Sequence, residues 1–146
     1  MLPPFDATGN LPPGIHIADW DEIQTRFGTT PRREQLLAGL AEALAQFRLA
    51  GCRRAYLDGS FVTNKHVPAD YDVCYDTRGM DPLYLDPVFF DVRAGRAAQK
   101  AKYGGEFFPV TMSAGPSYNF LQFFQVDKRT GSAKGIVAIE LLRTQP

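Results

Sequence analysis

The sequence predicts an α/β (α+β) fold, a small mixed β-sheet flanked by helices. Segments with apolar residues three or four positions apart alternate along the chain with short runs rich in β-branched and aromatic residues. The 146 residues, of which 45% are hydrophobic, are enough for one core but not for a second full domain. Helices that alternate with strands around one core are typical of a single sheet with helices packed against it.

Capping residues mark the ends of the first two predicted helices. Asp19, with an acidic residue three positions later, is typical of an N-cap, and Gly28 supplies an end to this short helix. Thr30 is a second N-cap candidate, and Pro31 suits the first helical position after it. Leucines then recur at helical spacing up to Gly51, which predicts the longest helix of the chain.

The remaining segments are assigned from their periodicity and turn residues. Strands are predicted at residues 53–57, 70–76, 106–112 and 135–142. Two further helices are predicted, one that begins at about residue 87 or 94 and ends at 103, and an aromatic-rich one at 117–126. Residues 1–18 contain four prolines and are predicted to be an extended arm along the surface rather than a regular element. Residues 19–146 then make up the single folded domain.

Charge and composition exclude several classes of protein. The 16 basic and 16 acidic residues cancel, which argues against bulk electrostatic binding to nucleic acid or anionic lipid and against a processive polymerase. No apolar stretch is long enough to span a bilayer, and the N-terminus does not resemble a signal peptide, so we expect a cytoplasmic protein without membrane contact. Cys52 and Cys74 lack metal-ligand spacing and are expected to be small buried side chains.

Two acidic residues lie two positions apart in the second predicted strand. Because strand side chains alternate between faces, Asp70 and Asp72 project from the same side of the sheet. A cation relieves their mutual repulsion, and hard carboxylate oxygens suit Mg²⁺ or Mn²⁺. A pair of such ions would bind the attacking and leaving oxygens of a phosphoryl transfer. The plainer interpretation is a solvated pair of acids at the end of a strand.

A Gly-Ser turn precedes these acids in the chain. Gly59 allows a ligand to approach the backbone closely, and Ser60 adds a hydroxyl donor. The residues that follow, Phe61 to Thr63, are suited to begin a helix, whose free N–H groups would bind phosphate oxygens. A Gly-Ser pair alone is in most proteins only a turn. Its combination with the paired acids indicates a nucleotide phosphate site.

The segment from Ala55 to Tyr75, AYLDGSFVTNKHVPADYDVCY, resembles the signature of the DNA polymerase β-like nucleotidyltransferase superfamily. That signature is a Gly-Ser turn, a short loop and an Asp-x-Asp pair on the next strand; here nine residues separate Ser60 from Asp70. The wider frame, with LPPGIH, RREQLLAGL, YGGEFFP and KGIVAIEL, is similar to small stand-alone bacterial nucleotidyltransferase-like proteins, some of which are associated with toxin–antitoxin or defence loci.

This resemblance implies roles for individual residues. Gly59 and Ser60 match the triphosphate-binding turn, and Asp70 and Asp72 match the paired catalytic metal ligands. Lys65 lies in the loop between the turn and the acids, where the phosphates are expected. It is therefore a candidate for nucleotide binding, although an ordinary surface lysine would also fit this position.

A third carboxylate, on a neighbouring strand, usually completes the site in this superfamily as general base or shared metal ligand. Glu106 is the first candidate because it follows a helix and opens a strand after the paired acids. Glu140, in an otherwise apolar strand, is the second, and Asp91 is the third. The sequence does not decide among them.

Two further groups of residues are assigned to ordinary structural roles. Arg93, Arg96 and Lys100 would share one helix face, where a solvated surface is preferred to phosphate binding. The aromatic residues of segment 117–126 have helical spacing and are expected to pack in the core rather than to stack on a base.

The expected activity is a metal-dependent nucleotidyl transfer. The resemblance implies that Mg²⁺ or Mn²⁺ holds a nucleoside triphosphate, with ATP the first choice, and that the nucleotide moves to a hydroxyl group of a partner protein, an RNA such as tRNA, or a small molecule. The alternative is a catalytically inactive binding module on the same fold, such as an antitoxin or a sensor, because fold does not guarantee function.

Overall fold

The structure is a computed structural model that describes residues 1–142, so the last four residues of the predicted 19–146 domain lie outside the described part. Its elements are, in chain order, β1 (Gly14–Ile17), α1 (Trp20–Phe27), α2 (Pro31–Leu49), β2 (Arg54–Asp58), β3 (Tyr71–Tyr75), α3 (Arg93–Tyr103), β4 (Gly105–Pro109), β5 (Ser113–Gly115), β6 (Tyr118–Asn119), α4 (Phe120–Phe123) and β7 (Gly135–Glu140). The predicted fold class, a small mixed sheet flanked by helices, is confirmed.

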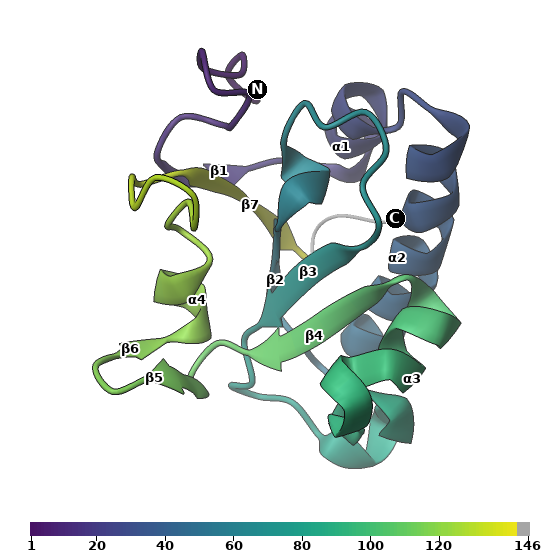
Figure 1. Ribbon diagram of the computed structural model, residues 1–146. Helices are drawn as coiled ribbons and strands as arrows, with labels where there is room; N and C mark the ends of the chain where they lie inside the picture. Colours follow the sequence, from purple (N-terminus) through teal and green to yellow (C-terminus); the bar gives the residue numbers. More distant parts are fainter. Residues whose placement is uncertain (143–146) are drawn as a thin grey trace.

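Five strands form the main sheet in the order β1-β7-β2-β3-β4 (Figure 1). The β1–β7 and β3–β4 pairs are parallel, whereas β2 is antiparallel to both of its neighbours. In this register Asp72 is paired with Asp58 on one side and with Glu106 on the other. Three acidic residues from β2, β3 and β4 therefore lie in one row across the sheet.

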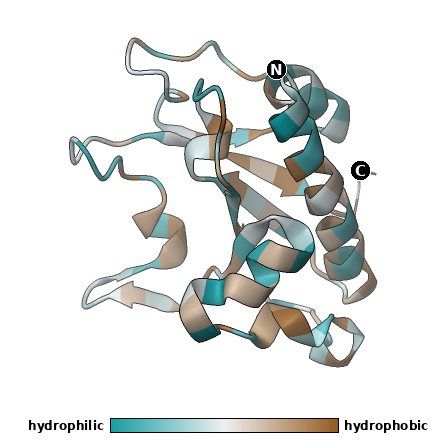
Figure 2. Ribbon diagram, turned by 45° about the vertical axis from the view of Figure 1, so that its right-hand side comes forward, coloured by the Kyte–Doolittle hydropathy of each residue, from teal (hydrophilic) through white to brown (hydrophobic). Residues whose placement is uncertain are grey.

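The two faces of the sheet are covered differently. Helices α1, α2 and α3 cover one face, where Leu40, Leu44 and Phe47 of α2 join strand residues such as Val73 and Phe107 in the main core. The hydrophobic strands lie behind these helices in Figure 2. The other face carries a much smaller cluster of buried Cys74, Phe108 and Phe124, with α4 and the β5–β6 hairpin beside it. The acidic row is on this less covered face because strand side chains alternate.

The predicted helix ends are confirmed for the first two helices. The Asp19 carboxylate accepts a hydrogen bond from the backbone N–H of Glu22 at 2.8 Å, and α1 ends at Gly28. The Thr30 hydroxyl accepts from the N–H of Arg33 at 3.2 Å, and Pro31 opens α2. The third helix begins nearer the later of its two predicted starts, because Pro87–Phe90 forms a separate 3-10 turn.

Two element predictions are wrong. The arm at residues 1–18 contains the edge strand β1, and Leu2 and Leu11 are buried in the core, since the proline-free segment Gly14–Ile17 pairs with β7. Segment 117–126 is not one helix but β6 followed by the single turn α4. Tyr118 pairs with β5. The Asn119 side chain caps the N-terminus of α4, so the helical turn begins after this residue rather than at residue 117.

Both cysteines are buried and free, as predicted. Burial raises the pKa of the Cys52 thiol to about 12, so this side chain is an unreactive neutral group at physiological pH. Within residues 1–142, no helix has the length and apolar character needed to cross a membrane.

Candidate functional site

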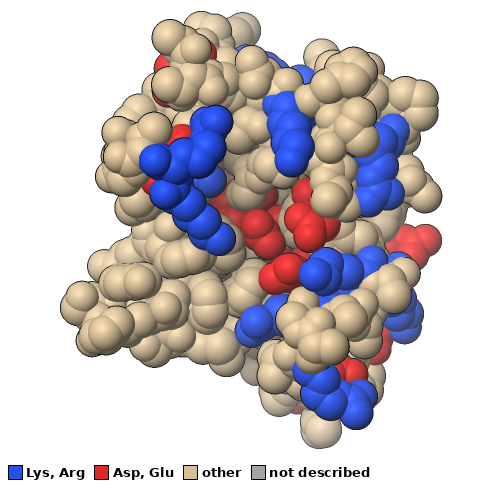
Figure 3. All heavy atoms as spheres, in the orientation of Figure 1, with Lys and Arg blue, Asp and Glu red and all other residues tan. Residues whose placement is uncertain are grey.

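The first three carboxylates of the predicted site meet on the exposed face of the sheet. Asp72 of β3 and Glu106 of β4 occupy paired positions, and Asp70 precedes Asp72 by two residues on the same side. Acidic side chains gather in the hollow at the centre of the face shown in Figure 3, and Lys and Arg side chains surround them. Of the three candidates for the third carboxylate, the structure brings Glu106 to the paired acids.

Burial and the repulsion of neighbouring acids make Asp70 and Asp72 hard to ionise. Burial, and then the charges of Asp70 and Glu106, raise the pKa of Asp72 to about 7. Burial and the charge of Glu106 also raise the pKa of Asp70, although Lys100 acts in the opposite direction. A bound cation would lower the free energy of these carboxylates, because it would replace the protons and relieve the repulsion between the negative charges.

Asp58, the β2 member of the acidic row, is the fourth carboxyl group of this cluster beside Asp70, Asp72 and Glu106. It is fully buried, and its Oδ1 atom has no hydrogen-bond partner within residues 1–142. Its other oxygen accepts a weak hydrogen bond from Cys74 Sγ at 3.8 Å. Burial and the neighbouring Asp72 raise the pKa of Asp58 well above its usual value. From its place beside the turn, the sequence suggests for Asp58 either a cap or a part of an acidic pocket; the structure places it in the acidic row.

The Gly-Ser turn follows β2 directly and contacts the acids. Gly59 has a φ of +82°, and a Cβ atom at this position would lie 2.5 Å from Asp72 Oδ2. Glycine is required here both for the left-handed backbone and for the close approach. The helix expected after the turn is only the 3-10 turn Ser60–Val62, so it has little dipole to offer a phosphate. Binding would rest on the amide groups at its start and on the Ser60 hydroxyl.

Arg33 of α2 holds the segment after this turn in place. Its buried guanidinium donates hydrogen bonds to the carbonyl oxygens of Phe61 at 2.6 Å, Thr63 at 2.8 Å and Lys65 at 2.7 Å. The guanidinium also lies over the Phe61 ring, 5.0 Å from its centroid. One planar side chain therefore fixes the backbone between the Gly-Ser turn and the loop that leads to the acids.

A cavity of about 480 Å³ opens beside the acids and the turn. Gly59, Ser60, Lys65 and Asp72 line it together, which brings four of the six predicted site residues to one cavity. Its opposite wall is a basic loop that the sequence analysis did not assign to the site, with Lys128, Arg129 and Lys134. The run KRTGSAK, with three cations within seven residues, is the only sequence signal for this loop, and it does not by itself indicate a ligand.

The N-terminal arm and the basic loop are joined at this cavity. The Asn10 side chain donates a hydrogen bond to Asp127 Oδ2 at 2.9 Å, and both residues are buried. Asp127 Oδ1 in turn accepts from the backbone N–H of Arg129 at 2.8 Å. The position of the basic loop thus depends on a residue 117 positions away in the chain, which sequence patterns do not reveal.

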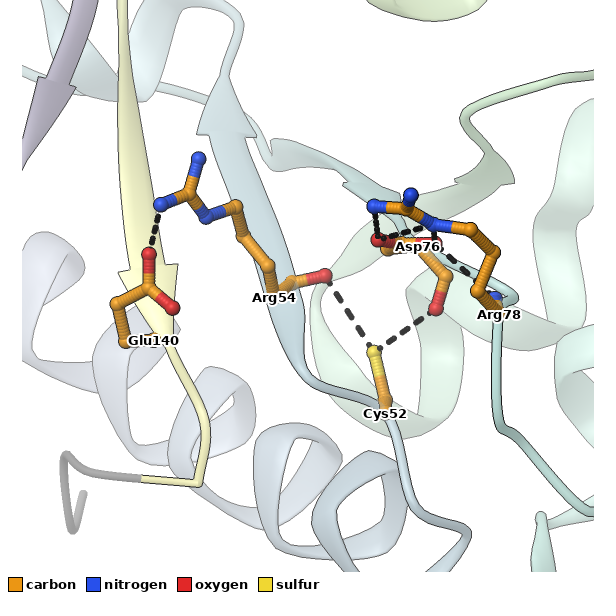
Figure 4. A network of polar contacts seen from close by, with 5 residues as sticks. All are labelled: Cys52, Arg54, Asp76, Arg78 and Glu140. Carbon is orange, nitrogen blue, oxygen red and sulfur yellow. Dashed lines mark hydrogen bonds and ion pairs between the residues drawn. The ribbon is translucent and has the colours of Figure 1, made fainter.

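The other two candidates for the third carboxylate lie elsewhere. Glu140 pairs with Arg54 at the opposite end of β2 from Asp58, close to Cys52 (Figure 4). Asp91 forms an exposed ion pair with Arg93 at 2.8 Å. Both acids have their own cation partners away from the Gly-Ser turn. They are therefore structural surface residues in this fold.

The three basic residues expected on one solvated helix face behave differently from one another. Arg93 is exposed, as expected. Arg96 instead lies 4.0 Å from the centroid of the Phe108 ring, in a left-handed stretch at the start of α3 that also includes Ala94. Lys100 forms an ion pair with Glu106 at 3.3 Å. Because regular helix begins only after Arg96, the three residues do not share a face.

The aromatic residues of segment 117–126 divide between two roles. Phe120 and Phe124 pack on Phe108, with ring centroids 4.4 and 5.2 Å apart, as expected for a small core. Phe123 and Phe124 also line the cavity beside the basic loop. An apolar wall next to the cations is therefore present, formed by residues whose helical spacing predicts only core packing.

The donor set suits a hard divalent cation in its chemistry. The acids supply only oxygen ligands, and Asp58 leaves one buried oxygen without a partner in the described chain. As the side chains stand within residues 1–142, no three His, Cys, Asp or Glu groups are arranged to bind a metal ion, and Glu106 is engaged by Lys100. Asp70 and Asp72 are the residues that would hold a cation, with Glu106 joining after release from Lys100.

Comparison with known proteins identifies a family but no activity. A family of unknown function, DUF6932, matches residues 3–140, a range that includes every residue of the acidic row and the cavity. No curated protein and no solved structure matches the chain. The protein therefore belongs to the DUF6932 family of unknown function.

Proposed function

We propose that this protein is a metal-dependent nucleotidyltransferase. The observation that carries the proposal is that Asp72 lines one cavity with the Gly59-Ser60 turn and has Asp70 and Glu106 as its acidic neighbours. These residues are far apart in the sequence, and only the pairing of β2, β3 and β4 unites them. A solvated group of surface acids would not need a glycine in contact with one of its carboxylates.

The proposed reaction assigns a task to each part of the site. The backbone N–H groups and hydroxyl of Ser60, with Lys65 and the basic loop, bind the triphosphate of a nucleoside triphosphate, with ATP as the first nucleotide to test. Asp70 and Asp72 would hold Mg²⁺ or Mn²⁺, which supplies neutralisation of charge on the transferring phosphate. Glu106 accepts the proton of the acceptor hydroxyl, and pyrophosphate leaves.

The proposed reaction also indicates which acceptors the protein modifies and in which cell compartment it acts. The acceptor is a hydroxyl group on a partner protein, an RNA such as tRNA, or a small molecule. Bulk binding of nucleic acid is not part of the proposal, because the 16 basic and 16 acidic residues leave no net positive charge. Nucleoside triphosphates and Mg²⁺ are supplied in the cytoplasm, so we place the reaction there.

One observation favours a second candidate, a binding module without turnover. Lys100 is paired with Glu106, and this pair withholds the third carboxylate from a cation. An antitoxin or sensor that binds a nucleotide but does not transfer it would retain the cavity and the basic loop. The two candidates differ in one measurable property, which is transfer of the nucleotide.

The test is transfer of label from α-labelled nucleoside triphosphates, each of the four in turn, with Mg²⁺ or Mn²⁺ and a cell lysate as acceptor. We expect label on an acceptor with the unaltered protein, and at least a hundredfold less with Asp72→Asn or Glu106→Gln. Removing a ligand of the metal that would neutralise the transferring phosphate, or removing the proton acceptor, costs transition-state stabilisation of this order.

Matched acidic controls come from the same chain. Glu140→Gln and Asp91→Asn remove carboxylates that lie outside the acidic row and should leave transfer within about twofold of the unaltered protein. Equal transfer by all five proteins would show that the acidic row is not the catalytic site. Binding of ATP and metal without any transfer would favour the binding module.

A further inference from the structure

A second cavity reaches the acidic row from the other side. It is a groove of about 560 Å³ between α2 and α3 that is lined by Gln35, Ala38 and Glu42 of α2 and by Lys100 and Lys102 of α3. Asp70 also lines this groove, whereas Asp72 lines the cavity that contains the Gly-Ser turn. The acids thus stand between two separate openings.

The sheet order fixes the sides from which these openings approach. The strands run β2-β3-β4, so Gly59 and Ser60 at the end of β2 lie on one side of Asp72. Glu106 on β4 lies on its other side, and α3 packs against β4. In an in-line displacement at phosphorus, the attacking oxygen enters opposite the leaving oxygen. A triphosphate held at Gly59-Ser60 directs its leaving pyrophosphate away from the α2–α3 groove.

We propose that the α2–α3 groove admits the acceptor and that the acceptor is a hydroxyl-bearing side chain of a protein segment, a serine, threonine or tyrosine with basic residues near it. This inference rests on the proposed nucleotidyl transfer and adds the place and class of the acceptor. It assigns one cavity to the nucleotide and the other to the partner protein.

The charge of the groove selects this class of acceptor. Lys100 is paired with Glu106 at 3.3 Å, and Lys102 with Asp86 at 2.5 Å. The third cation of the lining, Arg32, donates to the Pro68 carbonyl oxygen at 3.3 Å. Arg32 and the two acids of the lining, Glu42 and Asp70, have no ion-pair partner in the described chain. Together with the Glu106 and Asp86 carboxylates that bind its lysines, the groove holds four acids against three bases, a balance that favours a basic peptide over a polyanion such as RNA.

The transfer balances without a further reactant. The acceptor oxygen forms a bond to the α-phosphorus of the nucleoside triphosphate while the bond from that phosphorus to the bridging oxygen breaks. Pyrophosphate leaves with the electron pair of the broken bond. The hydroxyl proton passes to the Glu106 carboxylate, which is the strand partner of Asp72 and contacts Lys100 of the groove. The product is a nucleotidylated side chain.

The test fills the groove and leaves the nucleotide cavity intact. Ala38 is exposed on α2 and lines the groove, and Ala45 is exposed on the same helix but lines neither cavity. We expect Ala38→Trp to lower transfer of α-labelled nucleotide to lysate protein at least tenfold, with unchanged affinity for the nucleotide in the presence of Mg²⁺. Ala45→Trp should transfer like the unaltered protein. Glu42→Lys, which introduces a cation at the groove, should lower transfer to protein severalfold without filling the groove.

The outcomes separate this inference from the function on which it rests. The inference is supported if protease removes the label and ribonuclease does not, and if the label is lost in Ala38→Trp and kept in Ala45→Trp. Transfer by Ala38→Trp at the unaltered rate, or label found on RNA, overturns it while the proposed transferase activity stands. Absence of label with the unaltered protein overturns the activity and this inference together.

Discussion

At the scale of single residues, the site is defined by charge that the fold does not neutralise. Strand pairing holds Asp58 beside Asp72, and Asp70 lies two residues before Asp72. The pKa of each is raised because burial and like charge oppose ionisation. Such an arrangement lowers the stability of the protein, and natural proteins retain such arrangements mainly where function needs them. The folded state therefore carries an electrostatic cost that a bound cation would remove.

The first prediction concerns the pH dependence of stability. The pKa of Asp72 is about 7 in the folded protein, above its ordinary value of 3.8, so the folded state holds a proton that the unfolded state releases. Stability is then lost as the pH rises from about 4 to 7. Asp72→Asn removes this loss and should be more stable than the unaltered protein at pH 8, by up to about 4 kcal/mol, and nearly equal to it at pH 4.

Urea unfolding of both proteins in metal-free buffer at the two pH values measures this difference. Added Mg²⁺ should stabilise the unaltered protein and not the variant, since ligand binding to the folded state alone raises stability. A variant that is less stable at pH 8 would mean that Asp72 is a structural residue rather than a residue kept for its charge.

The second prediction separates the two reasons for glycine at the turn. Gly59 and Gly79 both have φ near +80°, but a Cβ atom at Gly79 meets no atom within 4 Å, whereas one at Gly59 meets Asp72. Gly79→Ala should cost only the left-handed strain, about 1 kcal/mol. Gly59→Ala should cost at least twice as much and abolish the Mg²⁺ stabilisation. Equal losses, measured by urea unfolding, would show that Asp72 is not in close contact with the turn.

At the scale of elements, the position of the phosphate-binding segment depends on α2. The guanidinium of Arg33 donates to the carbonyl oxygens of three alternate residues, 61, 63 and 65, and a lysine ammonium lacks the planar fork that makes this possible. The crossover through α3 has a comparable effect on the acids. The crossover makes β3 and β4 parallel, so both strands begin at the same end of the sheet. Glu106, near the start of β4, therefore lies beside Asp72, near the start of β3.

The third prediction tests this support. Arg33→Lys should lower the free energy of unfolding by about 2–4 kcal/mol, because buried carbonyl groups lose charged donors. It should also weaken nucleotide binding by at least tenfold, since Lys65 and Ser60 lie in the segment that Arg33 holds. Arg93→Lys is the control, as Arg93 is exposed, and it should change stability by less than about 0.5 kcal/mol. Unchanged amide hydrogen exchange at residues 61–65 in Arg33→Lys would contradict the role assigned to this arginine.

At the scale of the whole molecule, local signals predicted the elements and long-range pairing decided the site. Helix α2 follows from a cap, a proline and leucine spacing, all within its own segment. The third carboxylate could not be chosen from the sequence, because Glu106 is selected by the β3–β4 register and Glu140 is excluded by its pairing with Arg54. The basic loop was missed for the same reason, since it reaches the cavity through its bond to Asn10.

The segments that were predicted incorrectly depend on distant partners as well. The proline-rich arm at residues 1–18 has little strand character of its own. Its segment Gly14–Ile17 forms β1 because β7 offers an edge with which it can pair. The aromatic run at 117–126 has helical spacing, but β5 takes its first residues into a hairpin. In both cases tertiary pairing overrides local propensity.

The central claim is that the Gly-Ser turn and the acidic row form one site for a nucleoside triphosphate and its metal. The most direct measurement is a crystal structure of the protein with Mn²⁺ and a non-hydrolysable ATP analogue, in which anomalous scattering locates the metal. The account predicts manganese on carboxylate oxygens of Asp70 and Asp72, with the triphosphate against Gly59 and Ser60 and the basic loop beside it. Manganese absent from these carboxylates, or a nucleotide bound in any other cavity, would contradict it.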